Sequence, residues 1–242
     1  MVLTQSPTVA VVLPGTGSDA HFAERAFRGP LDARSVLTVA IEPDPRRVVD
    51  SYLEAMDAAA AEYGPILVGG VSIGAAVALQ WAARNPNLTT GVLAALPAWT
   101  GAPEGAPAAA SARFTASQLR SEGLESVIAA MLASSPAWLG RELERSWRSQ
   151  WPDLPCALDE ASTYSGLTVA AMSKIGVPVG IASAVDDPVH PTAIAHEWAA
   201  ALPHAHVGTL TLEQIGQDPA ILGSTCVKAL AAIETDTPRV PE

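Results

Sequence analysis

Six short apolar runs recur along this chain and restrict its fold more than any other feature. Each is five to seven residues long, rich in Val, Ile, Leu and Ala, and bounded by Gly, Pro or polar residues, as is typical of strands buried on both faces. Strands that alternate with amphipathic helices predict an α/β fold, a mostly parallel sheet covered by helices on both sides. The strand runs are residues 8–13, 36–41, 66–70, 91–96, 177–183 and 207–213, and the helical stretches are 45–63, 73–84, 192–201 and 218–233.

The alternation stops between the fourth and fifth runs. Residues 101–110 are rich in Gly, Pro and Ala, and apolar residues at helical spacing follow them. We therefore predict a core made of residues 1–98 and 176–242, with residues 99–175 inserted as a helical cap. Tryptophans gather in or beside this insertion; some could line a pocket, but for most we favour plain packing of the cap onto the core. They are Trp99, Trp138, Trp147 and Trp151.

Charge and composition exclude several classes of function. The formal charge of −11 disfavours nucleic acids and anionic membrane surfaces as partners. The N-terminus has no basic start followed by a long apolar stretch, and no run is long enough to cross a bilayer, so we expect a cytoplasmic protein. The cysteines, Cys156 and Cys226, lack metal-ligand spacing, and we expect free thiols rather than a disulfide.

The segment 66–76 carries the clearest chemical signal. An apolar strand leads into Gly70-Val71-Ser72-Ile73-Gly74, and a helix rich in alanine follows. A sharp strand-to-helix turn of this kind lifts a serine hydroxyl above the edge of the sheet, and the flanking glycines let strand and helix pack closely. The alternative is a glycine-rich turn in which Ser72 is an ordinary helix N-cap.

With this turn, the strand pattern and the predicted cap, the chain resembles the α/β-hydrolase family over residues 8–233. The resemblance implies a nucleophilic Ser72 and an oxyanion hole made of the backbone N–H groups of Thr16 and Ile73. Thr16 lies in the loop Pro14-Gly15-Thr16-Gly17 after the first strand, which could also be a plain turn. The loop lacks the pattern of a P-loop or a dinucleotide fingerprint, so we expect no organic cofactor and no metal.

The acid and the base are less regular. The family's orienting carboxylate follows the strand at 177–183, where Asp187 matches best and Asp186 is the near alternative; an Asx turn ahead of the next helix would also explain an aspartate here. The family's histidine normally follows the last strand, but no histidine occurs after His206. We predict that His190, in the acid loop itself, is the base. His21 is the second choice, and the alternative is that His190 is a surface residue ahead of a helix.

These residues predict a serine hydrolase that cleaves a carboxylic ester or thioester through an acyl-enzyme on Ser72, with a small ester or acyl compound as its substrate. A different reading is a non-catalytic protein of the same fold, which has lost its base and binds a ligand or a protein. A third is an acyltransferase. A homodimer is an alternative to a monomer.

Overall fold

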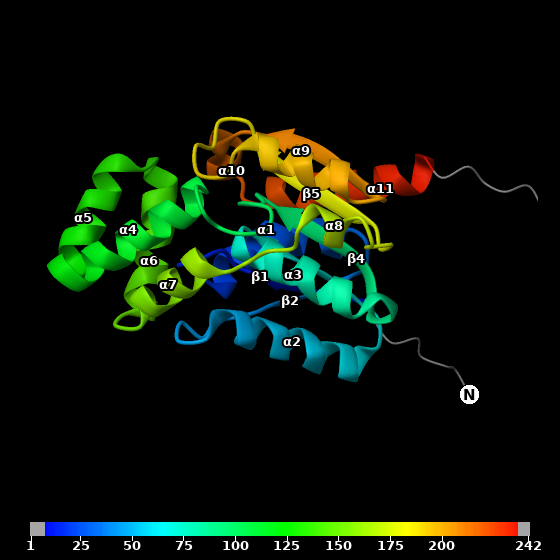
Figure 1. The fold of residues 1–242 in the computed structure, drawn as a ribbon, viewed down its shortest axis with the longest axis horizontal. Coiled ribbons are helices and arrows are strands. Elements are labelled where there is room, and N and C mark those ends of the chain that lie inside the picture. Colours follow the sequence, from blue (N-terminus) through cyan, green and yellow to red (C-terminus); the bar gives the residue numbers. More distant parts are fainter. Residues whose placement is uncertain (1–7, 237–242) are drawn as a thin grey trace, which may run out of the picture.

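The structure, a computed structural model, describes residues 8–236, and in this part of the chain six strands form one sheet (Figure 1). The strands are β1 (Val9–Leu13), β2 (Leu37–Ala40), β3 (Ile66–Val71), β4 (Thr89–Ala95), β5 (Val179–Ala184) and β6 (Ala205–Leu210). Their order is β2-β1-β3-β4-β5-β6, and all neighbouring pairs are parallel. Each predicted apolar run overlaps one of these strands, so the α/β fold is confirmed.

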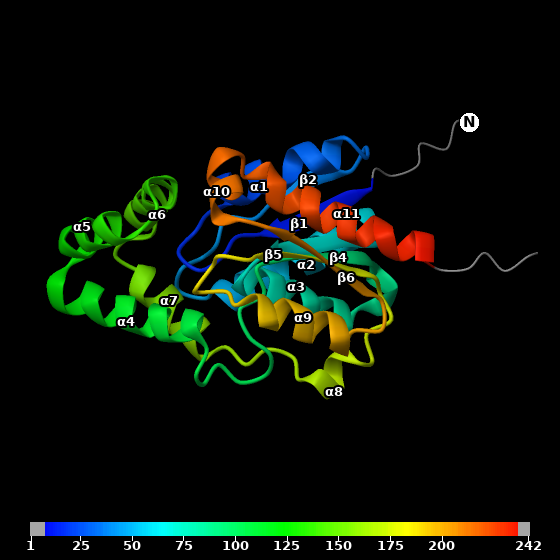
Figure 2. The same ribbon diagram turned by 90° about the horizontal axis from the view of Figure 1, so that it is seen from above.

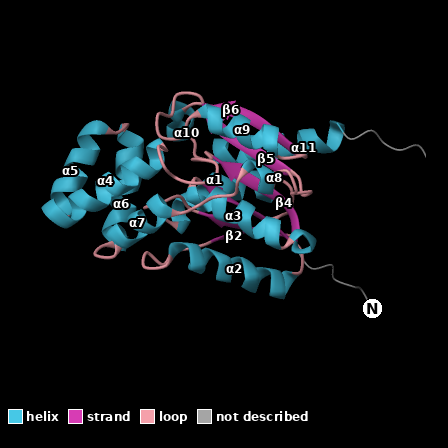
Figure 3. Cartoon of the chain, viewed as in Figure 1, coloured by secondary structure: helices cyan, strands magenta, loops and turns pink. Residues whose placement is uncertain are grey.

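Helices cover both faces of the sheet because both faces of each central strand are apolar. In β1, Val11 faces one core cluster and Val12 faces the other. One face carries α1 (Ala20–Asp32) and α11 (Ala220–Asp236). The opposite face carries α2 (Val48–Tyr63), α3 (Ile73–Arg84) and α9 (Thr192–Ala201), as Figure 2 shows from above. Two short helices, η1 (Pro86–Leu88) and α8 (Val169–Met172), directly precede β4 and β5, and Figure 3 labels α8.

The sequence order of the strands reverses at β1 and β3. The chain leaves β1 toward α1 on one face of the sheet and leaves β3 toward α3 on the other. Loops that diverge in this way open a crevice at the carboxyl ends of the strands, where α/β proteins bind their ligands. The fold therefore puts the loop with Thr16 and the turn with Ser72 side by side.

Two elements differ from the sequence prediction. Helix α1 was missed, although Phe22, Ala26 and Phe27 are buried at helical spacing and the Asp19 side chain accepts a hydrogen bond from the Phe22 N–H at 3.0 Å. The last strand ends at Leu210 rather than at residue 213. Here Thr211 and Gln214 form a capping box that starts α10 (Leu212–Gln217), which outweighs the β-branched pattern before it.

Four of the helices between β4 and β5 stand beyond one end of the sheet, at the left of Figures 1 and 2. They are α4 (Pro107–Glu122), α5 (Leu124–Ser134), α6 (Ala137–Gln150) and α7 (Leu154–Thr163). They share an apolar cluster of their own, to which Leu119, Ile128 and Leu158 belong. The exact limits of this insertion, residues 99 and 175, stay a prediction; Met172 and Ile175 pack with the core cluster of the sheet. None of the described helices is long and apolar enough to span a membrane.

Candidate active site

Ser72 occupies a strained turn between β3 and α3. Its backbone has φ 55° and ψ −114°, in a positive-φ region that L-residues rarely adopt. The Ser72 N–H donates a hydrogen bond to the Ala95 carbonyl at 2.9 Å, which holds the turn against β4. Strain of this kind costs about 1–3 kcal/mol and is typical of functional sites. Ser72 is thus held by its backbone, and its side chain does not cap α3.

The two glycines that flank Ser72 permit the close approach of β1. A Cβ atom on Gly70 would lie 2.6 Å from the Leu13 carbonyl oxygen, and one on Gly74 would lie 2.5 Å from the same atom. Both distances are shorter than real Cβ contacts. The Gly-x-Ser-x-Gly pattern is therefore required by the packing of α3 against the end of β1.

The loop after β5 brings Asp187 and His190 to this turn. His190 Nε2 lies 2.9 Å from Ser72 Oγ, and His190 Nδ1 lies 2.8 Å from Asp187 Oδ2. The second oxygen of Asp187 accepts the backbone N–H groups of Val189 at 2.8 Å and His190 at 3.2 Å. All three predicted side chains thus meet in one chain of hydrogen bonds. The Asx turn that offered a structural explanation for Asp187 is present as well.

Electrostatics favour an ionised Asp187. Its carboxyl is largely buried, and burial alone would raise its pKa. The hydrogen bond and charge of the His190 ring, with the N–H groups of Val189 and His190, outweigh burial and lower the pKa of Asp187. A carboxylate beside Nδ1 keeps the proton on that nitrogen. Nε2 is then free to accept the Ser72 hydroxyl proton.

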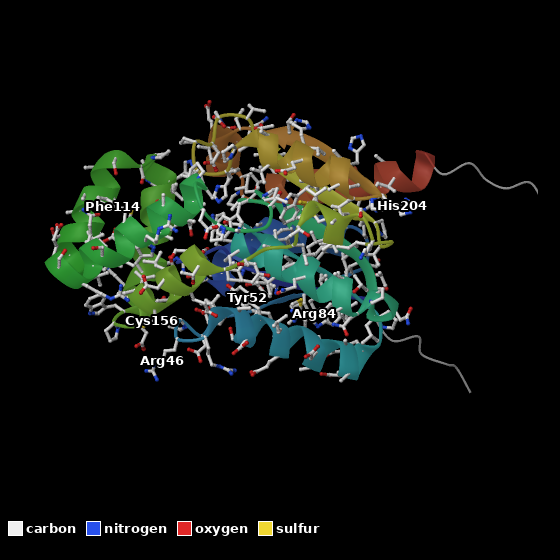
Figure 4. The ribbon with its side chains drawn as sticks, in the orientation of Figure 1. Arg46, Tyr52, Arg84, Phe114, Cys156 and His204 are labelled. Atoms are coloured by element: carbon white, nitrogen blue, oxygen red, sulfur yellow. The ribbon has the colours of Figure 1, made fainter. Side chains whose placement is uncertain are left out.

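The other candidate residues point elsewhere. Asp186 accepts the Leu212 N–H at 2.8 Å and so holds the start of α10. His21 and His196 are exposed. Figure 4 labels His204 near the far end of α11, away from the inserted helices.

The loop after β1 approaches Ser72 closely. A Cβ atom on Gly15 would lie 3.6 Å from Ser72 Cβ. The Tyr52 hydroxyl donates to the Pro14 carbonyl at 3.0 Å, and burial raises the pKa of Tyr52, so this donor stays protonated. Within the described residues, neither the Thr16 N–H nor the Ile73 N–H donates a hydrogen bond. Both are therefore available to an oxyanion.

Helix α6 holds the same loop from the other side, a relationship that the sequence analysis missed. Ser146 Oγ donates to the Gly17 carbonyl at 2.6 Å, and Gln150 Nε2 donates to the Ser18 carbonyl at 2.8 Å. The Arg145 guanidinium forms an ion pair with the buried Asp19. No local pattern in the sequence could have revealed these pairs, because more than 120 residues separate the partners.

A cavity of about 830 Å³ opens between this site and the inserted helices. Its walls include Ser72, His190 and Thr16, and much of the remaining lining is apolar. Three of the four tryptophans in or beside the insertion also line the cavity: Trp99, Trp138 and Trp147. For most of them the sequence favoured plain packing of the cap onto the core. Trp151, by contrast, is 39% exposed.

The described residues contain no group of three or more His, Cys, Asp or Glu side chains placed to hold a metal ion. Cys156 is exposed, Cys226 is buried, and both are free thiols. Burial raises the pKa of the Cys226 thiol far above its usual range. Cys226 is therefore an inert core residue.

The fold and this arrangement define an α/β hydrolase, and comparison with known proteins agrees. The chain belongs to the alpha/beta hydrolase family, whose model matches residues 3–221. No curated protein matches the sequence. All solved structures described next are below 25% identity, so their likeness concerns the fold.

Three solved structures illustrate this likeness. A carboxylesterase from Nitrososphaera gargenis has a TM-score of 0.74 at 12% identity, with 96% of this chain and 92% of that chain covered. An enol-lactonase from Burkholderia xenovorans has a TM-score of 0.64 at 18% identity, with coverage of 95% and 92%. BpoC from Mycobacterium tuberculosis, a candidate non-heme bromoperoxidase, has a TM-score of 0.68 at 18% identity, with coverage of 95% and 94%.

Proposed function

We propose that this protein is a serine hydrolase that cleaves carboxylic esters or thioesters through an acyl-enzyme on Ser72. The observation that carries the proposal is the contact of 2.9 Å between Ser72 Oγ and His190 Nε2, with Asp187 bound to the other ring nitrogen. A hydroxyl, a neutral imidazole and a buried carboxylate in this order form the arrangement that activates a serine for acyl transfer.

The acylation step follows from the geometry. His190 Nε2 takes the hydroxyl proton as Ser72 Oγ attacks the carbonyl carbon, and the ionised Asp187 stabilises the imidazolium that forms. The N–H groups of Thr16 and Ile73 bind the oxyanion. When the tetrahedral intermediate collapses, the alcohol or thiol leaves with the proton from His190, and the acyl group stays on Ser72.

Deacylation repeats these steps with water as the nucleophile. His190 removes a proton from the water molecule as its oxygen attacks the acyl carbon. The collapse of the second intermediate returns that proton to Ser72 Oγ and releases the carboxylic acid. One ester and one water thus give one acid and one alcohol, with no cofactor consumed.

A fluorophosphonate probe tests the proposal, because it reacts covalently only with an activated serine. We expect wild-type protein to be labelled and Ser72→Ala to be unlabelled. Hydrolysis of 4-nitrophenyl butanoate should disappear in the same variant. A folded wild-type protein that neither reacts with the probe nor hydrolyses the ester would instead be a non-catalytic binding protein.

A further inference from the structure

The wall of the cavity beside Ser72 is poor in charge. Among the described residues that line it there is no lysine or arginine, and the acidic side chains are Asp187 and Glu142. Asp187 is already bound to His190, which is the base of the proposed mechanism. A negatively charged substrate would therefore find no cation on the lining other than a protonated His190.

Several guanidinium groups on and beside α6 are already engaged by carboxylates. Glu142 is bound by both Arg25 and Arg145, and Arg145 also binds Asp19. Further along α6, Arg148 forms ion pairs with two glutamates. To bind a substrate anion, one of these arginines would have to leave its partner. The formal charge of −11 opposes anions further.

The cavity continues from Ser72 along an apolar wall formed by the inserted helices. Val127 and Met131 of α5 and Leu139 and Leu143 of α6 line this part. Phe114 of α4 lines it too and is 62% exposed, and Figure 4 shows it among the inserted helices, away from the sheet. Phe114 thus extends the apolar wall of the cavity to the solvent-exposed surface.

We propose that the substrate is a neutral ester whose apolar chain, much larger than acetyl, lies along this wall between α4, α5 and α6. The inference rests on the proposed function of Ser72 and narrows it. It excludes esters with an ionised group on the chain, and thioesters whose chain ends in a carboxylate. A volume of about 830 Å³ suits such a chain, since pockets of roughly 300–1,000 Å³ accommodate drug-sized ligands.

A series of 4-nitrophenyl esters tests chain length. From acetate to butanoate to octanoate, we expect kcat/KM to rise by up to about fourfold for each methylene that becomes buried. A pair of esters matched in chain length tests neutrality: the 4-nitrophenyl ester of methyl-capped suberate should react at least about 100-fold faster than the 4-nitrophenyl monoester of suberate with its free carboxylate. Equal rates within either comparison would overturn the proposal.

A cation placed on the wall should weaken the preference for the neutral ester. Thr115 of α4 is half-buried and lines the cavity, whereas Ser117 of the same helix is exposed and lies outside it. Thr115→Lys should raise kcat/KM for the suberate monoester about tenfold and lower it for octanoate. Ser117→Lys adds the same charge and should change neither. An equal response in both variants would mean that the cavity wall does not select the substrate.

A binding measurement separates this inference from the proposed chemistry. The indoles of Trp99, Trp138 and Trp147 line the cavity, so their fluorescence reports occupancy without turnover. In Ser72→Ala, 4-nitrophenyl octanoate should quench this fluorescence at a concentration at least about tenfold below that needed with the suberate monoester. That result supports the neutral apolar ligand even if the fluorophosphonate probe fails to label the wild type. Tighter binding of the monoester would overturn the substrate class while leaving Ser72 reactivity untouched.

Discussion

Asp187 binds both the backbone and the imidazole ring of His190, which lies three residues further along the same loop. One carboxylate oxygen accepts the N–H groups of Val189 and His190, and the other holds His190 Nδ1. The carboxylate therefore fixes the loop and the ring together. Only Ser72, 118 residues away from His190 in the chain, has to be supplied by the rest of the fold.

The first prediction concerns the two adjacent aspartates of this loop. Asp187→Asn keeps the size of the side chain but removes the charge that stabilises the imidazolium, and it favours the wrong tautomer of His190. We expect kcat for 4-nitrophenyl butanoate to fall by about 10⁴.

Asp186→Asn is the matched control, because an amide oxygen can still accept the Leu212 N–H. This variant should retain kcat within about twofold. If Asp186→Asn were as inactive as Asp187→Asn, the assignment of the acid would be wrong.

The second prediction concerns strain at Ser72. Glycine adopts a φ of 55° without the steric cost that an L-residue pays, so Ser72→Gly should abolish hydrolysis yet raise the free energy of unfolding by about 1 kcal/mol. Ser72→Ala should lose activity without that gain. Urea denaturation of the three proteins measures the difference.

Ser35 offers a matched control for the same strain. It has φ 58°, is exposed and does not line the cavity. Ser35→Gly should stabilise the protein by a similar amount and leave kcat unchanged. A Ser72→Gly variant that is less stable than the wild type would argue against stored strain at the turn.

The contact between α6 and the loop after β1 leads to the third prediction. Gly17 has φ 71°, and a Cβ atom there would lie 2.7 Å from Trp147 Nε1. In Gly17→Ala the loop must move away from α6 and carry the Thr16 N–H with it, so we expect kcat/KM to fall by at least about tenfold.

Gly105→Ala isolates the steric part of this effect. Gly105 has φ 79°, but a Cβ atom there meets nothing within 4 Å. Both variants share the backbone penalty, so the extra loss of stability in Gly17→Ala, about 1–3 kcal/mol, reports the clash with Trp147. Equal stability and equal kcat/KM in the two variants would show that α6 does not control the loop.

The fourth prediction concerns acid stability. The pKa of Asp187 is lower in the folded protein than its ordinary value of 3.8. Between the folded and the ordinary value the unfolded chain binds more protons, so stability rises with pH through that window. The contribution of Asp187 is complete above about pH 4 to 5 and is lost as the pH falls through the folded pKa.

Urea denaturation of wild type and Asp187→Asn between pH 7 and pH 2.5 measures this contribution. At pH 7 we expect the wild type to be more stable by about 1 kcal/mol, since the variant weakens hydrogen bonds to a charged group. The two curves should converge below pH 4. A difference that stays constant down to pH 2.5 would exclude an ionised Asp187 as its source.

Sequence alone predicted the sheet and singled out the three side chains that meet at the candidate site, because their signals are local. Buried parallel strands need continuous apolar runs, and the turn at Ser72 needs glycines on both sides. His190 could be chosen because it shares a loop with Asp187. The hold of α6 on residues 17–19 could not be predicted, since it joins ordinary Ser, Gln and Arg side chains to backbone atoms and an aspartate far away in the chain.

The end of β6 shows a second limit. Residues 207–213 continue a strand pattern, but the reciprocal bonds of Thr211 and Gln214 start a helix within it. The strand propensity of successive residues does not indicate where a side chain will form hydrogen bonds to the backbone and so end the strand. Helix α1 escaped notice for a different reason: its apolar spacing was readable, but Gly29 and Pro30 near its end weaken the helical signal.

A loop that contains both Asp187 and His190 has a consequence for how such a site could be transplanted. The carboxylate and the imidazole orient each other through contacts that span four residues. One short peptide therefore contains both groups and the contacts that orient them. Grafting residues 185–191 after the corresponding strand of another protein of this architecture would transfer both groups in a single exchange. The segment after β6 would then not have to supply a histidine.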